Sequence, residues 1–353
     1  MAYRLKTLTP LHIHSGDVLK PMEYIIKNEE VFIFNEIDVI RSIKENELLN
    51  SELLNSYAFT SKRSEYYKNL DYYINKGIID KGLLSEYRFK AINKSKNLNE
   101  KDIYRTMRNI QGTYIPGSSV KGVIRTAILY CYILEKDIDY IKKAVDFIEK
   151  NRVYKNGKYI TSKYDIDDYI IYSTNNSNEK LTKNIQRDPF RFLIVRDINM
   201  TKNEIVIYDE TIYDVNKFIY GKTIETIKEG DYTEEFGFEI RQKDINLLKE
   251  KTEYNFDLVK YLNEKQILKA LYQFSIDIID DEIEYFKEQK NPLFNSKEII
   301  EKLEEIKEKN SEDSPVIRIG KGKGYKSNTL ALAIKKLDKD YYNREIKNIA
   351  KPY

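Results

Sequence analysis

The N-terminal segment alternates between apolar and polar positions. Two sets of side chains fall on opposite faces of residues 3–14: Leu5, Thr7, Thr9, Leu11 and Ile13 on one, and Arg4, Lys6, His12 and His14 on the other. A period of two residues is typical of a β-strand with one exposed face. The pattern therefore predicts a first strand over residues 3–14 that ends at Ser15 and Gly16.

Further apolar runs, each bounded by polar turn residues, predict additional strands. We expect three strand pairs joined by short turns: residues 24–26 with 31–34, 191–197 with 204–208, and 223–227 with 235–240. A last strand is predicted at residues 316–319, immediately before a glycine-rich segment.

Other segments have helical character. Apolar residues recur at helical spacing over residues 258–289 and again at Leu330, Ile334 and Leu337, and residues 296–310 form a charged segment. This spacing predicts amphipathic helices. Residues 35–110 are polar and helix-prone, with many Lys, Glu and Tyr, so we interpret them as an insertion and not as part of the core.

The most structured motif spans residues 114–126, with an extended entry, a Pro-Gly turn, a serine N-cap and then a helix. Lys121 and Arg125 are four residues apart, and they therefore share one flank near the helix N-terminus, where free N–H groups attract anions. This predicts a phosphate site made of Gly117, Ser118, Ser119, Lys121 and Arg125. The alternative is a capped amphipathic helix with ordinary solvent-facing cations.

A loop near the C-terminus alternates glycine with lysine. It consists of Gly320, Lys321, Gly322, Lys323, Gly324, Tyr325 and Lys326. Tyr325 stands where nucleotide-binding fingerprints require glycine, so the loop fits neither a P-loop nor a dinucleotide site. Lysines beside one stacking ring fit a polymer of phosphates better. The alternative is a lysine-decorated glycine turn after an edge strand.

His12 and His14 are the two histidines of the chain, and alternate strand positions place both rings on one face. They could contact phosphates or act as an acid and base, and a purely structural role is equally open. No spaced Cys or His completes a zinc site, so we predict neither a metal nor another cofactor.

Composition limits the class of protein. The 353 residues are 41% hydrophobic, enough for a sizeable core, and the net charge of +3 says little about partners. Charge is unevenly distributed, because residues 314–353 hold 10 basic and 3 acidic residues whereas residues 267–313 hold 7 basic and 13 acidic residues.

The single cysteine, Cys131, excludes an internal disulfide, and no apolar stretch is long enough to span a membrane. We expect a cytoplasmic protein without a membrane partner. The 30 tyrosines accompany abundant Lys, Ile, Asn and Glu, which is typical of an AT-biased genome, so their number is no evidence for base stacking.

Taken together, these motifs resemble the RAMP proteins of CRISPR systems in order and spacing. The resemblance is carried by residues 11–16, 114–125, 188–191 and 195–197 and by the glycine-rich loop. Within that superfamily, the chain is most similar to the fifth subunits of type III-A Csm effector complexes. This closer similarity rests on residues 21–24, the insertion before residues 114–125, residues 227–230 and the chain length.

The resemblance implies an α+β fold with a ferredoxin-like (RRM-like) βαββαβ core. It implies one RAMP domain over residues 1–353, with the core at about 1–34, 111–245 and 314–353, a helical insertion at 35–110 and a helical, acidic segment at 246–313. It also implies a non-catalytic subunit that binds the 3′ part of the CRISPR RNA (crRNA), caps the backbone filament and supports crRNA maturation in antiviral defence. The implied partners are crRNA, the backbone RAMP and small subunits of the Csm complex, and in some systems a recruited host nuclease.

One departure from the family concerns His14, which stands where family members commonly carry glycine, so we expect its ring to replace a backbone contact. With that change, His12, His14, Ser15 and Gly16 join the predicted RNA-binding residues. Asp17 lies too close to Gly16 to match the aspartate with which paralogues cut target RNA. Two alternatives stay open: a metal-independent RAMP endoribonuclease that processes repeat RNA with His12 and His14, and a protein-docking module that uses residues 267–313.

Overall fold

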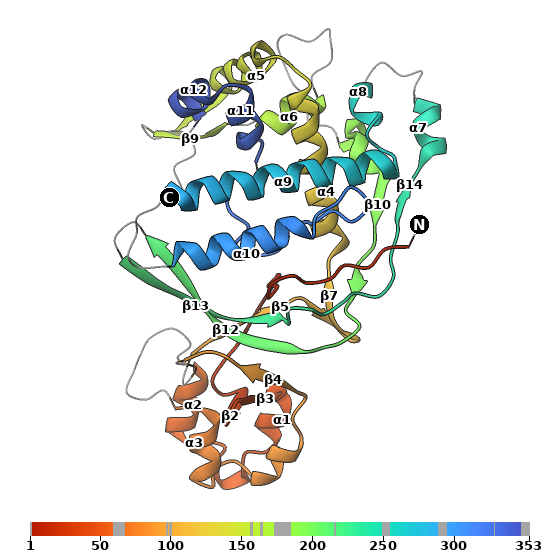
Figure 1. Ribbon diagram of the computed structural model, residues 1–353. Helices are drawn as coiled ribbons and strands as arrows, with labels where there is room; N and C mark the ends of the chain where they lie inside the picture. The colour runs from red at the N-terminus through yellow and green to blue at the C-terminus, as the bar shows by residue number, and fades with distance from the viewer. Residues whose placement is uncertain are drawn as a thin grey trace. The chain divides into compact units, whose positions relative to one another are not determined.

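The computed structural model describes residues 2–58, 68–96, 98, 101–155, 158–162, 165–172, 185–214, 217–248, 255–288, 295–327 and 329–346. The chain forms two compact units within the span predicted as one RAMP domain. We call residues 2–115 and 198–235 the sheet unit, and residues 116–197 and 236–353 the helical unit. Both are built from segments that are distant in the sequence (Figure 1).

A seven-stranded mixed sheet dominates the sheet unit. Its strands, in spatial order, are β1 (His14–Leu19), β5 (Ile103–Thr106), β13 (Lys217–Ile227), β12 (Ile205–Asp214), β4 (Phe89–Asn93), β3 (Glu30–Ile33) and β2 (Tyr24–Lys27). β5 runs parallel to β13 and β4 runs parallel to β12, while the other neighbours are antiparallel. A smaller sheet contains β6 (Arg108–Asn109), β7 (Gly112–Ile115) and β11 (Ile198–Asn199).

The predicted N-terminal strand is only partly correct. Residues 5–11 are extended and bond to residues 227–233 at intervals, as when the Leu11 amide donates to the Ile227 carbonyl at 3.0 Å. Pro10 has no N–H to donate, which limits a continuous ladder here. The regular strand β1 begins at His14 and continues through Gly16, where the sequence pattern ended the strand. A register shift and the positive φ of Gly16, +96°, mark a bulge at this point.

The sequence identified about half of the described strands and paired several of them wrongly. The hairpin of β2 and β3 is confirmed, with Tyr24 opposite Ile33. The pairing of residues 191–197 with 204–208 is wrong, as is that of 223–227 with 235–240. Instead β10 (Leu193–Val195) pairs with β14 (Phe238–Ile240) in the helical unit, and β12 pairs with β13 in the sheet unit. An apolar pattern shows that a strand is buried, but not which strand lies beside it.

The predicted helical insertion over residues 35–110 is wrong in its second half. Its first half forms α1 (Glu36–Arg41), η1 (Glu45–Glu47), α2 (Ser51–Ala58), α3 (Leu70–Asn75) and η2 (Lys81–Ser85). After η2, β4 and β5 enter the interior of the seven-stranded sheet. Both strands are short and carry Lys or Arg between buried residues such as Ala91 and Ile103, which hides their alternation.

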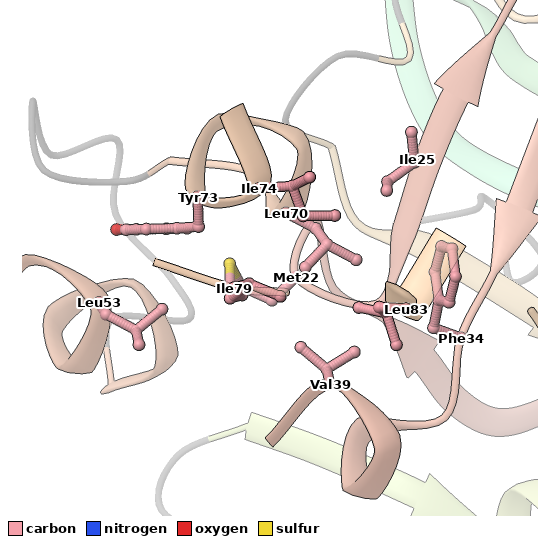
Figure 2. Close-up of a cluster of buried hydrophobic side chains, with 10 residues drawn as sticks. All are labelled: Met22, Ile25, Phe34, Val39, Leu53, Leu70, Tyr73, Ile74, Ile79 and Leu83. Atoms are coloured by element: carbon pink, nitrogen blue, oxygen red, sulfur yellow. The ribbon is translucent and has the colours of Figure 1, made fainter. Parts of the chain in front are cut away.

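The helices after β3 form their own apolar core against the β2–β3 hairpin (Figure 2). Figure 2 shows Met22, Ile25 and Phe34 facing the helical side chains. Tyr24, the residue before Ile25, instead joins a second core inside the sheet. Strand alternation therefore sends neighbouring residues of β2 into two cores and holds the helices on the sheet.

The helical unit contains the described α-helices that follow α3 in the chain. They are α4 (Gly117–Leu134), α5 (Ile138–Lys150), α6 (Ile166–Tyr172), α7 (Gln242–Leu248), α8 (Phe256–Val259), α9 (Glu264–Glu288), α10 (Ser296–Glu308), α11 (Ala331–Leu337) and α12 (Lys339–Tyr341). The single turns η3 (Ile185–Arg187), η4 (Pro189–Phe192) and η5 (Tyr342–Ile346) and the hairpin of β8 (Arg152–Lys155) and β9 (Lys158–Ser162) complete it. The helices predicted near residues 258–289, 296–310 and 330–337 are confirmed.

Helix α4 packs on α9 through buried aromatic residues. The Tyr130 hydroxyl donates to Asp277 Oδ2 at 2.7 Å, and its ring lies 4.9 Å from that of Phe274.

The strand predicted at residues 316–319 is wrong, because this segment joins no sheet. Its first amide, Val316 N, donates to the Asn310 side chain at 2.8 Å, so a loop and not a ladder holds it.

Candidate nucleic-acid interface

The N-terminus of α4 differs from the predicted serine cap. Pro116 occupies the N-cap position, and no side chain of that residue bonds the first turn. Instead the Gly117 amide donates to Asp197 Oδ1 at 2.8 Å. A carboxylate is favourable at this position because the helix dipole is positive here. The chain thus supplies an anion of its own at the terminus where we predicted a phosphate.

Gly117 is required by packing. A Cβ atom on Gly117 would lie 2.1 Å from the Val195 carbonyl oxygen and 2.6 Å from that of Arg196. Both distances are far below contact distance, so only glycine lets α4 approach this strand end. The motifs at residues 114–125 and 195–197 are therefore joined physically, through the packing of Gly117 and the Asp197 hydrogen bond.

Lys121 and Arg125 share one flank of α4, as predicted. This flank lies beside Asp188 and Phe190. Burial lowers the pKa of Lys121, the carboxylate of Asp188 opposes that change, and the Arg125 charge adds to it. The Arg125 guanidinium lies 5.9 Å from the ring centre of Phe190. Ser118 is exposed and Ser119 is half-buried on the same turn. Two cations and an exposed hydroxyl thus remain available near the capped terminus.

The glycine–lysine loop has the backbone that its sequence predicts. Gly320, Gly322 and Gly324 have φ angles of +81°, +79° and +78°, in the region that favours glycine. A Cβ on Gly322 or Gly324 would meet no atom within 4 Å, so their conformation and not crowding requires glycine. Lys321 and Tyr325 are exposed beside them, and Lys323 is half-buried. Burial lowers the pKa of Lys323.

The basic C-terminal segment binds the acidic face of α9. Arg318 Nη2 lies 2.5 Å from Glu282 Oε2, and Lys326 pairs with Asp281. Asp281 also accepts from Lys335 at 2.5 Å, and Asp277 pairs with Lys336 at 2.6 Å. Several described cations of residues 314–346 are therefore paired with carboxylates of α9 inside the helical unit. Lys326, predicted to contact RNA, anchors the loop to α9.

This anchor gives a pH-dependent prediction. Burial raises the pKa of Asp281, but the bonds from Lys326 and Lys335 outweigh it and lower the pKa overall. The stabilisation from a lowered pKa is present above the unfolded value of about 3.9 and is lost as pH falls through the folded value. We expect Asp281→Asn to lower the free energy of unfolding by about 2 kcal/mol at pH 7, with the difference from wild type beginning to shrink as the pH falls below about 4 and disappearing below the lowered folded pKa.

The measurement is thermal unfolding of both proteins from pH 7 to pH 3. Asp280→Asn is the matched control, because Asp280 is the preceding residue of α9 and forms an exposed pair with Lys307. That variant should differ little from wild type at every pH. A constant deficit for Asp281→Asn across the pH range would contradict the ion-pair explanation.

The two histidines lie in the sheet unit and differ in exposure. Their rings stack with centroids 5.7 Å apart, so they share a face as predicted. His12 is only 5% exposed and its Nδ1 lies 2.7 Å from the Glu225 carbonyl oxygen, whereas His14 is exposed. The Ser15 hydroxyl donates to the Arg105 carbonyl at 3.2 Å. His12 is thus a buried residue held by the backbone, and His14 is the accessible ring.

The predicted RNA-binding residues fall into two groups. His12, His14, Ser15 and Gly16 belong to the sheet unit, and those of α4 and the glycine–lysine loop belong to the helical unit. Sequence reasoning gave no role to Asp197 or to Asp281. The ion pairs of Asp281 could have been suspected from the acidic segment that precedes the basic one, but its individual partners could not.

Comparison with known proteins shows to which family a chain with these motifs belongs. A family model described as the RAMP superfamily matches residues 4–328. The chain belongs to the RAMP superfamily. The match includes the histidine segment, the α4 motif and the glycine–lysine loop, so it covers every predicted site of this RAMP protein.

Individual relatives agree with the resemblance predicted from the sequence. The chain is 24% identical over 357 aligned positions to the CRISPR system Cms protein Csm5 of Methanocaldococcus jannaschii, covering 99% of this chain and 77% of that protein. A chain in the cryo-EM structure of a type III-A Csm–crRNA–target RNA ternary complex has a TM-score of 0.69 and 20% identity, covering 97% of this chain and 90% of that one. The crystal structure of T. onnurineus Csm5 has a TM-score of 0.67 and 19% identity, with 94% of each chain covered. These likenesses confirm an α+β fold of the RAMP type.

Membrane-spanning and metal-binding features were considered for the described residues alone. Within the helices described, none is long and apolar enough to cross a membrane. Among the same residues, no group of three or more His, Cys, Asp or Glu side chains could hold a metal ion.

Proposed function

We propose that this RAMP protein is the Csm5-type subunit of a type III-A CRISPR interference complex. It binds the 3′ part of the crRNA, caps the filament of backbone subunits and supports crRNA maturation in antiviral defence. Its partners are crRNA, the backbone RAMP and small subunits, and in some systems a recruited nuclease. The observation that carries the proposal is the similarity to Csm5 over 99% of this chain, together with the family match.

The geometry of the glycine–lysine loop supports an RNA ligand. Gly320, Gly322 and Gly324 give the loop three positive φ angles, and Lys321 is exposed between them. Such a loop can follow a chain of phosphates with N–H groups and point charges. Tyr325, 43% exposed, adds a ring on which any base can stack.

Three finer statements belong to the same proposal. The core derives from a ferredoxin-like (RRM-like) βαββαβ arrangement, which the mixed sheet of the sheet unit supports. The subunit is non-catalytic, and the burial of His12 favours this over an endoribonuclease that would use His12 as acid or base. It acts in the cytoplasm, where an RNA-guided complex of this class meets its target.

The test of the proposal is purification of the tagged full-length chain from cells that carry its CRISPR system. We expect small RNA containing repeat and spacer sequence to copurify, along with neighbouring RAMP subunits. The control is the same tagged chain purified from cells in which the CRISPR array has been deleted, and it should yield no such RNA. Recovery of the protein alone, without RNA or RAMP partners from the intact system, would contradict the proposed function.

The contribution of the loop to RNA binding is a separate prediction. A Lys321→Ala, Lys323→Ala double variant should flatten the slope of log affinity against log salt, by about 0.7 for each phosphate of a single strand that the protein no longer neutralises. Filter binding of single-stranded repeat RNA at several salt concentrations measures the slope. Lys297→Ala, Lys302→Ala on α10 removes two cations of the same unit and should leave the slope unchanged. Equal slopes for wild type and the loop variant would remove the loop from the RNA site.

A further inference from the structure

A row of aromatic and cationic side chains crosses three neighbouring segments of the sheet unit. The His14 ring lies 5.7 Å from that of His12 and 5.5 Å from that of Tyr104. Lys222 Nζ lies 3.7 Å from the centre of the Tyr104 ring. We call His14, Tyr104 and Lys222 the aromatic row, with His12 as its buried end. Neither Tyr104 nor Lys222 was singled out by the sequence.

The strand register explains how these residues meet. Val18 of β1 and Ile224 of β13 stand opposite Tyr104 of β5 on either side. Lys222 is two residues before Ile224 and therefore shares its face. His14 stands opposite Thr106, two residues from Tyr104 on the same face of β5, and its ring lies 5.5 Å from the Tyr104 ring.

The row lies on the face of the sheet opposite the core. Ile103 and Glu225, which alternate with Tyr104 and Ile224, are fully buried on the other face. His14 and Lys222 are exposed and Tyr104 is half-buried. Because two members of the row face solvent, the row contributes little apolar burial to the fold. An exposed cation over an aromatic ring adds little to the stability of a protein.

Lys222 differs from the ion-paired cations of this unit. Lys20, Lys90 and Lys228 each form an ion pair with a carboxylate. Within the described part of the chain, Lys222 Nζ forms none, and the nearby Glu210 Oε2 accepts instead from the Lys222 backbone amide at 3.4 Å. The row therefore presents a positive charge that no carboxylate among the described residues neutralises, beside aromatic rings.

A partly exposed ring next to a cation without a carboxylate partner is a combination that can bind single-stranded nucleic acid. The ring stacks on a base and the cation neutralises the adjoining phosphate. We infer that the aromatic row is a second RNA contact, in which Tyr104 stacks on an unpaired base and Lys222 binds its phosphate, with His14 flanking the base. This rests on the proposed function for its ligand, but it assigns a base-binding site made of different residues from the glycine–lysine loop.

The test uses the full-length protein and single-stranded repeat RNA carrying 4-thiouridine. We expect Tyr104→Ala to weaken binding about tenfold, because loss of one stacked base has about that effect, and Tyr104→Phe to bind like wild type since it keeps the ring. Lys222→Ala should flatten the salt slope by about 0.7, while Lys222→Arg should not. Photocrosslinking of the RNA to the peptide that contains Tyr104 should be strong in wild type and absent in Tyr104→Ala.

Tyr232→Ala is the matched control. Tyr232 is another exposed tyrosine of the sheet unit, 43% exposed, with Lys6 Nζ 5.1 Å from its ring centre. Its replacement should leave RNA affinity unchanged, and an equal loss in Tyr104→Ala and Tyr232→Ala would refute a specific site. Thermal unfolding of each variant shows whether a loss of binding reflects misfolding, and Tyr104→Phe and Lys222→Ala still decide the matter if Tyr104→Ala unfolds.

The outcomes separate this inference from the proposed function. If Lys321→Ala, Lys323→Ala weakens binding but the Tyr104 and Lys222 variants do not, the aromatic row is not an RNA contact and the proposed function stands. If wild type binds no RNA and copurifies with none, both fail. If Tyr104→Ala keeps RNA affinity but no longer copurifies with neighbouring subunits, the row is a protein contact and the inference is overturned.

Discussion

Replacing Glu225 by Gln is expected to lower the free energy of unfolding by about 3–5 kcal/mol, the cost of breaking a buried ion pair. Glu225 is fully buried in the sheet unit. Its Oε2 lies 2.7 Å from Arg108 Nη2 and accepts from the Thr106 amide at 3.2 Å, and its Oε1 lies 3.9 Å from Arg105 Nε. Without the carboxylate, two mostly buried guanidinium groups would lose their counter-charge.

The pKa shifts show how costly this burial is. Burial raises the pKa of Glu225, although the charges of Arg108 and Arg105 oppose that rise. Burial also lowers the pKa of Arg108, against the attraction of Glu225. Each charge is therefore tolerated in the interior only because the other is present. The Arg108 guanidinium additionally lies 4.1 Å from the ring centre of Phe89, which packs the group in place.

Urea unfolding of wild type and Glu225→Gln measures the difference. Glu204→Gln is the control, because Glu204 pairs with Lys228 at the surface of the same unit, with side-chain exposures of 44% and 47%. An exposed pair contributes about 0–1 kcal/mol, so the control should change little. A Glu225→Gln effect no larger than that of the control would show that the buried cluster does not hold β5 and β13 together.

Gly117→Ala is expected to destabilise the helical unit by about 3 kcal/mol, at the upper end of the effect of overpacking. The added Cβ would lie 2.1 Å from the Val195 carbonyl oxygen, a backbone atom that cannot rotate away. The strand end must shift, and the 2.8 Å bond from the Gly117 amide to Asp197 would be strained or broken. We therefore also expect weaker RNA binding through the Lys121 and Arg125 flank.

Gly122→Ala on the same helix is the matched control. A Cβ on Gly122 would meet no atom within 4 Å, so alanine there should raise stability by about 1 kcal/mol through its higher helix propensity. Thermal and urea unfolding of both variants give the comparison. Similar effects of the two substitutions would mean that contact with residues 195–196 is not what requires glycine at position 117.

Local sequence patterns predicted what depends on neighbouring residues. Helices α9 and α11 were found from the spacing of their apolar residues, because a helix buries one stripe of its own surface, and α10 was found as a charged helix. The β2–β3 hairpin was found because its strands and turn are contiguous. Positive φ at the loop glycines followed from their residue type alone. The motifs at residues 11–16, 114–125, 188–191 and 195–197, together with the loop, indicated the RAMP superfamily.

The pairing of distant segments was decided by the tertiary structure. β10 pairs with β14, although the predicted partner of each is nearer in the sequence, and β12 pairs with β13, the next strand in the chain, where a different partner was predicted for each. Alternation could not tell that His12 would be buried and His14 exposed. The partners of each charge also depend on the fold: Lys326 was predicted to contact RNA, yet Asp281 holds it, and Asp197 occupies the helix terminus predicted for a phosphate.

By itself the sequence determined helices α4, α9, α10 and α11, the β2–β3 hairpin, the loop conformation and the superfamily, because each depends on residues close together in the chain. The tertiary structure alone decided which strands adjoin, which cations are already neutralised and which remain available, as Lys222 does beside Tyr104. The physical reason is that burial and charge pairing are properties of the space around a residue. That space is filled by segments more than a hundred positions away, such as Glu225 beside Arg108.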